Sequence, residues 1–272
     1  MNIVICIKQV SKLIIESTIN TIDSRMCRVN RETAKLILNP FDKYVIEESV
    51  RIKEKMGGKV TAITMGPYKS ESILRKAISK GVDEAFLISD IAFKGSDALA
   101  TSYVLSCAIK HIRRDYDIII CGTQSLDGDT GQVGPSIAEM LDIPHISYVS
   151  KIESIDIDKK TIKVIRKMED GYDIIRSSIP VLLTVVKGIN TPRMTSFKSN
   201  MISKKAKVKI LNAFDINADI KKIGLRGSPT KVAKLLTISY SYDIISKKST
   251  EEETCDQIID ILIRRLFNMK II

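Results

Sequence analysis

The chain has 272 residues, 44% of them hydrophobic, so it can bury a substantial core in one large α/β domain or in one domain with an appendage. Lys and Arg number 43 against 32 Asp and Glu, a net charge of +11, but the sequence has no Trp and its basic residues are not interleaved with aromatic ones. Composition therefore argues against nucleic-acid binding through base stacking, and a solvated basic surface is the default interpretation.

Cysteine and histidine usage excludes several further classes. The five cysteines form no C-x-x-C pair, and the two histidines, His111 and His145, do not supply metal-ligand spacing. We therefore predict no metal site and no disulfide framework. The apolar run at residues 3–7 is too short for a signal sequence or a membrane span, so we expect a cytoplasmic protein that binds no membrane. No nucleophile and base can be grouped either, which favours a carrier role over a self-contained enzyme.

The first elements predict a strand, an excursion and a helix. Residues 2–7 are a near-continuous apolar run, the pattern of a parallel strand buried on both faces. Residues 11–38 show only a weak pattern and are interpreted as an excursion or irregular hairpin. The sequence Asn39-Pro40-Phe41-Asp42 then predicts a helix start, with Asn39 as the N-cap and Pro40 in the first helical position.

Strands and helices alternate along the next part of the chain. Predicted strands lie at 59–65, 85–88 and 118–121, and predicted helices at 70–80, 98–113 and 133–141. This alternation predicts a mostly parallel, doubly wound sheet covered on both faces. Ligands of such sheets bind at the carboxyl ends of the strands.

The loop between the strand at 118–121 and the following helix is rich in small and polar residues, from Gly122 to Gln132. It places unpaired N–H groups and the positive end of a helix dipole at one point, which suits a phosphate. Asp129 is expected to cap the helix. Spacing alone does not separate a nucleotide site from a glycine-rich loop that binds nothing, because the pattern is neither G-x-G-x-x-G nor a Walker loop.

After Pro144 the pattern changes to β-type runs at 146–152, 161–168 and 172–176, separated by turn residues, which predicts an antiparallel extension of the sheet. Residues 180–186 predict one more buried strand. Near the end of the chain, an amphipathic pattern at 258–269 after a capped start at Thr250 predicts a helix that buries its apolar face on a partner.

Several of these segments resemble one family. The run from Cys121 to Pro135, CGTQSLDGDTGQVGP, resembles the nucleotide-binding signature of the electron transfer flavoprotein β subunit. Further segments resemble the same family in the same order, and the resemblance extends from Met1 to about Val232; these segments are Asn39–Asp42 with the following EESVR, Met65 before Gly66-Pro67, Asn190–Arg193, and Gly224–Val232.

The resemblance implies a fold like that of the adenine nucleotide α-hydrolases, with an antiparallel extension and a C-terminal arm. It implies a nucleotide-binding core at 1–190, a partner-docking loop and basic segment at 191–210, and an arm at 211–272 that contacts the α subunit. Arg193, Phe197 and Met201 would dock a partner flavoprotein such as an acyl-CoA dehydrogenase.

The same resemblance implies, position by position, which residues bind the cofactor. They are Cys6, Asn39, Pro40, Phe41, Asp42, Met65, Gly122, Thr123, Gln124, Ser125, Leu126, Asp127, Gly128, Asp129, Thr130, Gly131, Gln132, Val133 and Gly134. The loop looks like the type that holds FAD in bifurcating members, with NAD(H) as a substrate. The alternative within the family is a simple carrier whose site holds AMP.

Two rival functions belong to other classes. An ATP-binding ligase or sensor would need a loop for the extra phosphates, and the chain offers none of the Ser-Gly-Gly type. A basic RNA-binding protein would use Lys204–Lys209, and its affinity would fall steeply with salt. The expected partners are therefore an α subunit and a second flavoprotein, without nucleic acid.

Overall fold

The computed structural model describes residues 1–11, 22–23, 28–29, 36–230 and 263–264. The chain divides into two compact units, Met1–Leu235 and Leu236–Ile272. In the second unit only Ile263 and Arg264 are described, and both are helical. The rest of the predicted C-terminal helix lies outside the described residues.

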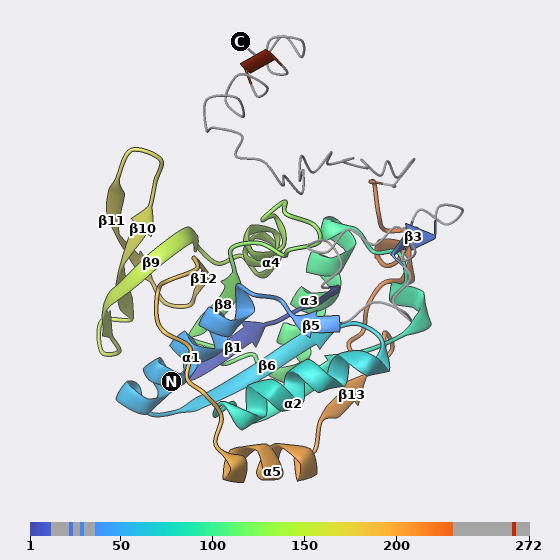
Figure 1. Cartoon of the computed structure of the whole chain (residues 1–272), viewed down its shortest axis with the longest axis horizontal. Coiled ribbons are helices and arrows are strands. Elements are labelled where there is room, and N and C mark those ends of the chain that lie inside the picture. Colours follow the sequence, from blue (N-terminus) through green and yellow to red (C-terminus); the bar gives the residue numbers. More distant parts are fainter. Residues whose placement is uncertain (12–21, 24–27, 30–35, 231–262, 265–272) are drawn as a thin grey trace, which may run out of the picture. The chain divides into compact units, whose positions relative to one another are not determined.

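The first unit is built on a nine-stranded sheet in the order β11-β10-β9-β12-β8-β1-β6-β7-β13 (Figure 1). Each neighbouring pair from β9 to β13 is parallel. The predicted mostly parallel α/β sheet is therefore confirmed. Its parallel strands are β1 Asn2–Cys6, β6 Lys59–Met65, β7 Glu84–Ile88, β8 Ile118–Gly122, β9 His145–Asp156, β12 Val181–Val185 and β13 Lys209–Leu211.

The antiparallel extension is also confirmed. β10 Thr161–Lys167 pairs antiparallel with both β9 and β11 Tyr172–Ser178. β11 is the edge strand of this extension. Its side chains are mostly exposed, whereas buried side chains occur at alternate positions at the start of β10.

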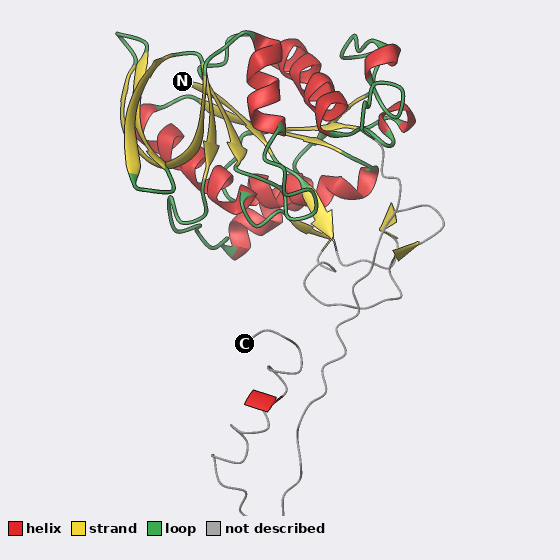
Figure 2. Ribbon diagram, turned by 90° about the horizontal axis from the view of Figure 1, so that it is seen from above, coloured by secondary structure: helices red, strands yellow, loops and turns green. Residues whose placement is uncertain are grey.

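Helices cover both faces of the sheet (Figure 2). Helices α1 Asp42–Met56 and α2 Glu71–Ser79 pack against alternate strand residues such as Ile3 and Ile5. Helices α3 Ala98–Ile112 and α4 Val133–Leu141 pack against the other set, which includes Val4. Successive residues of β1 thus enter opposite cores, as the period of two requires.

The excursion after β1 forms two short antiparallel pairs. β2 Gln9–Ser11 pairs with β5 Leu36–Leu38, and β3 Ile22–Asp23 pairs with β4 Arg28–Val29. These pairs agree with the hairpin interpretation. The other residues between 12 and 35 lie outside the described part of the chain.

Beyond β12 the chain crosses the helices and returns to the sheet. Helix α5 Phe197–Lys205 contacts α2, and β13 then adds to β7, so the compact unit continues past residue 190, where the sequence analysis ends the core. Short 3-10 helices lie at η3 Tyr68–Ser70, η4 Ile91–Phe93 and η5 Ile220–Lys222.

The Gly224–Thr230 segment docks on the start of α3. Asp97 accepts hydrogen bonds from the Thr230 amide (3.0 Å) and hydroxyl (2.6 Å). Gly224 has φ +58°, and a Cβ there would lie 2.2 Å from the Ala92 carbonyl oxygen, so glycine is required at this close approach.

None of the helices in the described part of the chain has the length and apolar character needed to cross a lipid bilayer.

Candidate functional site at the carboxyl ends of β1 and β8

The loop from Thr123 to Gln132 leaves the carboxyl end of β8 and enters α4. β8 lies between β1 and β12 in the sheet, so the residues that follow β1 and the end of β12 flank the loop. This is the edge at which open α/β sheets bind ligands.

Asn39 supports the loop and does not cap α1. The helix begins at Asp42, its N-cap is Phe41, and no side chain caps it. Asn39 and Pro40 form the first half of a turn closed by the bond from the Asp42 amide to the Asn39 carbonyl (3.0 Å). The predicted N-cap at Asn39, with Pro40 in the first helical position, is therefore wrong, because both residues lie in this turn and the helix begins after it.

The buried side chain of Asn39 has a different task. Its Nδ2 donates to the Gln124 carbonyl oxygen (2.9 Å) and to Asp42 Oδ1 (2.9 Å), and its Oδ1 accepts from the Leu126 amide (3.2 Å). The amide group thus satisfies both a donor and an acceptor of the loop. Asn39 fixes the first half of the loop to the start of α1.

Asp42 lies beneath the strand end. Its carboxylate accepts from the Lys8 amide (2.6 Å) as well as from Asn39. Burial raises the pKa of Asp42 to about 7, although both bonds oppose the shift. A Cβ on Gly122 would lie 2.5 Å from Asp42 Oδ1, so a residue with a side chain does not fit at position 122.

Lys8 joins the end of β1 to the loop, and the sequence analysis missed it. Its Nζ lies 2.5 Å from Asp127 Oδ1 and donates to Ser125 Oγ (3.1 Å). Burial opposes ionisation of Asp127, but the charge of Lys8 and its hydrogen bond outweigh it and lower the pKa of Asp127. The available signal was position: Lys8 directly follows the apolar run of the first strand.

Asp129 does not cap α4, so that prediction is wrong. The N-cap of α4 is Gln132, without a side-chain bond. Asp129 instead sits in a turn at φ 53°, where its amide donates to the Ser125 carbonyl (2.8 Å) and its carboxylate accepts from Gln124 Nε2. This turn ends too far before α4 for the carboxylate to reach the first helical amides.

Thr123 anchors the loop to β12. Its hydroxyl (2.6 Å) and its amide (3.2 Å) both donate to the Val185 carbonyl, and the residue is buried. At the other end of the loop, Gly134 packs closely against β12, and a Cβ at this position would lie 2.7 Å from Thr184 Cγ2. Both ends of the loop are therefore held on β12.

The second half of the loop has free donors. Gly128, Asp129, Thr130 and Gln132 are exposed. Within the described residues, the amides of Thr130, Gly131 and Gln132 have no hydrogen-bond acceptor. Gly131 adopts φ +64°, which turns the backbone into α4. Adjacent free amides before a helix start form an anion-binding geometry.

Cys6 and Met65 lie at the ends of their strands. Cys6 is buried and paired in register with Cys121 on β8. Their contact and burial raise the pKa of the Cys121 thiol, so these thiols are packing groups. Met65 ends β6 and packs partly buried against the α3 side of the sheet.

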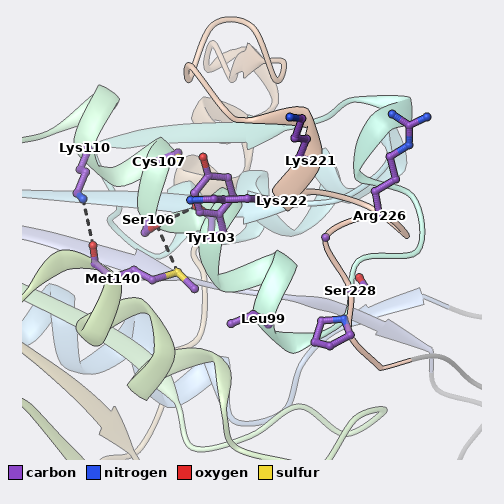
Figure 3. A pocket seen from close by; sticks show the side chains of 12 residues that line it. Leu99, Tyr103, Ser106, Cys107, Lys110, Met140, Lys221, Lys222, Arg226 and Ser228 are labelled. Carbon is purple, nitrogen blue, oxygen red and sulfur yellow. Dashed lines mark hydrogen bonds between the residues drawn. The ribbon is translucent and has the colours of Figure 1, made fainter.

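Two cavities lie away from this loop. The larger, about 660 Å³, lies between α3 and residues 221–229, where Lys222 Nζ sits 5.5 Å from the Tyr103 ring centroid (Figure 3). The second, about 580 Å³, lies on β9, β10 and the end of β12. The loop itself is an open edge of the unit.

The predicted docking segment is held on α1. Arg193 bonds to Glu47 Oε2 (2.9 Å) and Glu54 Oε1 (2.5 Å), so its guanidinium is occupied within the chain. Burial opposes ionisation of Glu47, but the bonds from Arg193 and Arg51 outweigh it and lower the pKa of Glu47 to about 2.

The apolar side chains of this segment face outward. Met194 is 95% exposed, Phe197 82% and Met201 43%. Met194 is exposed like Phe197 and Met201, the two apolar side chains predicted to dock a partner, but it was not among the predicted residues. Its position, an apolar residue between Arg193 and the start of α5, could have indicated it.

The same chain was compared with known proteins. Residues 27–215 match the family model described as the electron transfer flavoprotein domain. The electron transfer flavoprotein subunit beta of Thermoanaerobacterium thermosaccharolyticum is 48% identical over 239 residues, 87% of this chain and 88% of that protein.

Two further relatives come from other bacteria. Protein FixA of Azotobacter vinelandii is 41% identical over 241 residues, covering 86% of this chain and 83% of that protein. The subunit beta of Megasphaera elsdenii is 37% identical over 278 residues and covers both chains completely (100% of each). The chain belongs to the electron transfer flavoprotein family.

Proposed function

We propose that this chain is the β subunit of a heterodimeric electron transfer flavoprotein and that it holds FAD at the loop from Gly122 to Gly134. The α subunit is its constant partner, and electrons pass onward to a second flavoprotein such as an acyl-CoA dehydrogenase. The three free amides at Thr130–Gln132, in a loop whose first half is held by Asn39, are the observation that carries the proposed cofactor site.

Each part of the loop has a separable task in this proposal. The free amides bind phosphate oxygens, and the helix dipole of α4 favours their charge. Asn39 and Thr123 keep the backbone in place. A flavin, when bound, supplies hydride and single-electron transfer, while the protein positions it and shields it.

FAD and AMP share the adenosine and phosphate that such a loop recognises. FAD is proposed because residues 127–130 of the loop are exposed and Gly128 adds no side chain there. We further propose the bifurcating type of reaction, with NADH as hydride donor.

The cofactor content of the purified heterodimer tests this assignment. After co-expression with the α subunit and acid release, chromatography should find two FAD per heterodimer. One FAD plus one AMP would instead identify a simple carrier, and a heterodimer without any adenine nucleotide in this subunit would refute the site. Thr130→Trp, an exposed position, should abolish this subunit's share of nucleotide and should melt at the same temperature as nucleotide-stripped wild-type protein.

The docking assignment predicts a partner effect at Phe197. Phe197→Asp should weaken binding to the partner dehydrogenase by about tenfold or more, because an exposed aromatic anchor is replaced by a charge. Surface plasmon resonance with the intact heterodimer measures it. Tyr172→Asp is a matched control, since Tyr172 is an aromatic side chain that is 68% exposed and lies outside residues 191–272. Equal losses in both variants would contradict the assignment.

A further inference from the structure

Charge is distributed unevenly around the proposed phosphate loop. Residues 122–134 contain two acids, Asp127 and Asp129, and no Lys or Arg. An anionic ligand there would meet repulsion from both carboxylates unless a cation from another element offsets it.

Lys8 is that cation. Among the described residues it is the one basic side chain with a hydrogen bond or ion pair to the loop, through Asp127 (2.5 Å) and Ser125 (3.1 Å). Its backbone amide is fixed separately on Asp42 (2.6 Å), so the main chain at position 8 is anchored independently of the ammonium group. The Lys8 side chain remains 45% exposed, so solvent has access to it.

Asp127 and a ligand phosphate therefore require the same ammonium group. The Asp127 side chain is 23% exposed, so its carboxylate can turn toward water when the ion pair opens. Asp129 differs: it carries the same charge in the same loop but bonds to Gln124 and has no contact with Lys8.

We propose that Lys8 is the phosphate-positioning cation of the nucleotide site and that Asp127 is a built-in competitor for it, which lowers nucleotide affinity. This inference rests on the proposed function. It adds Lys8 to the nucleotide site and gives the ion pair with Asp127 a role in setting the nucleotide affinity. The shared chemistry is the phosphate group, present in both AMP and FAD. A loosely held nucleotide would be the direct result of this competition.

Binding measurements on stripped heterodimer test the proposal, with AMP and FAD titrated separately by calorimetry. Lys8→Met should weaken both nucleotides by roughly tenfold to a hundredfold, the range for a hydrogen bond to a charged group. Lys8→Arg should retain most of the affinity. Asp127→Asn should tighten binding by roughly twofold to fivefold, because releasing an exposed ion pair is worth little.

Two controls separate the ion pair from general charge effects. Asp129→Asn removes the same charge and should change affinity less than Asp127→Asn. In a Lys8→Met background, Asp127→Asn should give no tightening. Melting temperatures verify that each variant is folded.

Three results would overturn the inference. Weaker binding in Asp127→Asn would make Asp127 a direct ligand, for instance of ribose hydroxyls. Equal tightening in Asp127→Asn and Asp129→Asn would reduce the effect to bulk charge. Unchanged binding in Lys8→Met would remove Lys8 from the site. If the wild-type protein bound neither nucleotide, the proposed function itself would fail.

Discussion

Asn39 holds the loop at residues 122–134, the proposed nucleotide site, through its side-chain amide. Replacing it by Ala leaves the Gln124 carbonyl and the Leu126 amide without their partners beneath the loop. We expect a loss of about 1–3 kcal/mol in the free energy of unfolding, the usual cost of leaving buried polar groups unsatisfied. Urea denaturation measures it, and the variant should also lose nucleotide. Wild-type stability in Asn39→Ala would show that the loop does not need this support.

Asp42 should make stability depend on pH. Its pKa rises from 3.8 to about 7 on folding, so the folded state binds the proton more tightly. Its contribution to stability is therefore fully present below pH 3.8 and is lost as the pH rises through about 7. In Asp42→Asn this part of the slope should vanish.

The measurement compares denaturation midpoints of wild-type protein and Asp42→Asn at several pH values. The stability advantage of the wild type should be greater at low pH than above the folded pKa. A difference that stays constant with pH would mean that the pKa of Asp42 does not change on folding.

Residue roles at the site were predictable only in part. The glycine-rich loop could be placed at this edge because small and polar residues between a buried strand and a helix predict it, whereas Asn39 and Asp42 were assigned to the site by the family resemblance alone. The sequence analysis misjudged Asn39 and Asp129 as caps, since capping residues and loop-supporting residues have the same chemistry and differ only in backbone position. Lys8 was missed because its partner lies far along the chain, at Asp127.

Helix α1 carries a buried carboxylate, Glu47, whose charge is balanced by two arginines. Glu47 is only 3% exposed and is paired with both Arg51 (2.7 Å) and Arg193 (2.9 Å). Arg193→Met should cost roughly 2–4 kcal/mol, because it leaves a buried carboxylate with fewer partners. Glu47→Gln should cost about 1 kcal/mol, since Arg193 keeps Glu54 and water.

Acid titration checks the same pair. The pKa of Glu47 falls from 4.5 to about 2 on folding, so its stabilisation is present above pH 4.5 and is lost as the pH falls toward 2. The Arg193→Met variant should lose most of this acid dependence. If its acid unfolding matched that of the wild type, the pair would not hold the segment on α1.

Element positions were predicted better than their contacts. The strand predicted at 59–65 has the observed bounds of β6, and the helices at 98–113 and 133–141 match α3 and α4 closely, because buried strands and amphipathic helices carry strong periodic patterns. β13 was missed because its three residues, Lys209–Leu211, are too few to show a period.

At the scale of the whole molecule, the parallel sheet could be inferred because alternating strands and helices permit few right-handed arrangements. One of its edges is β11, where Tyr172 is 68% and Ile174 62% exposed. An edge strand with exposed apolar side chains is prone to pair with another chain. We expect the chain expressed alone to aggregate more than the chain expressed with the proposed α subunit.

Light scattering at equal protein concentration tests this, with Ile174→Lys as the companion variant. A charge on the edge strand should reduce self-association of the isolated chain. Equal scattering from the isolated wild type and Ile174→Lys would show that the chain does not self-associate through β11.

Helix α1 has 15 residues and spans about 22 Å. The turn that precedes it holds the cofactor loop through Asn39, and its outer surface holds the docking segment through Glu47 and Glu54. Helix α1 thus connects the proposed nucleotide site and the predicted docking segment. We expect binding at one of these places to change the affinity of the other, by the same factor in both directions.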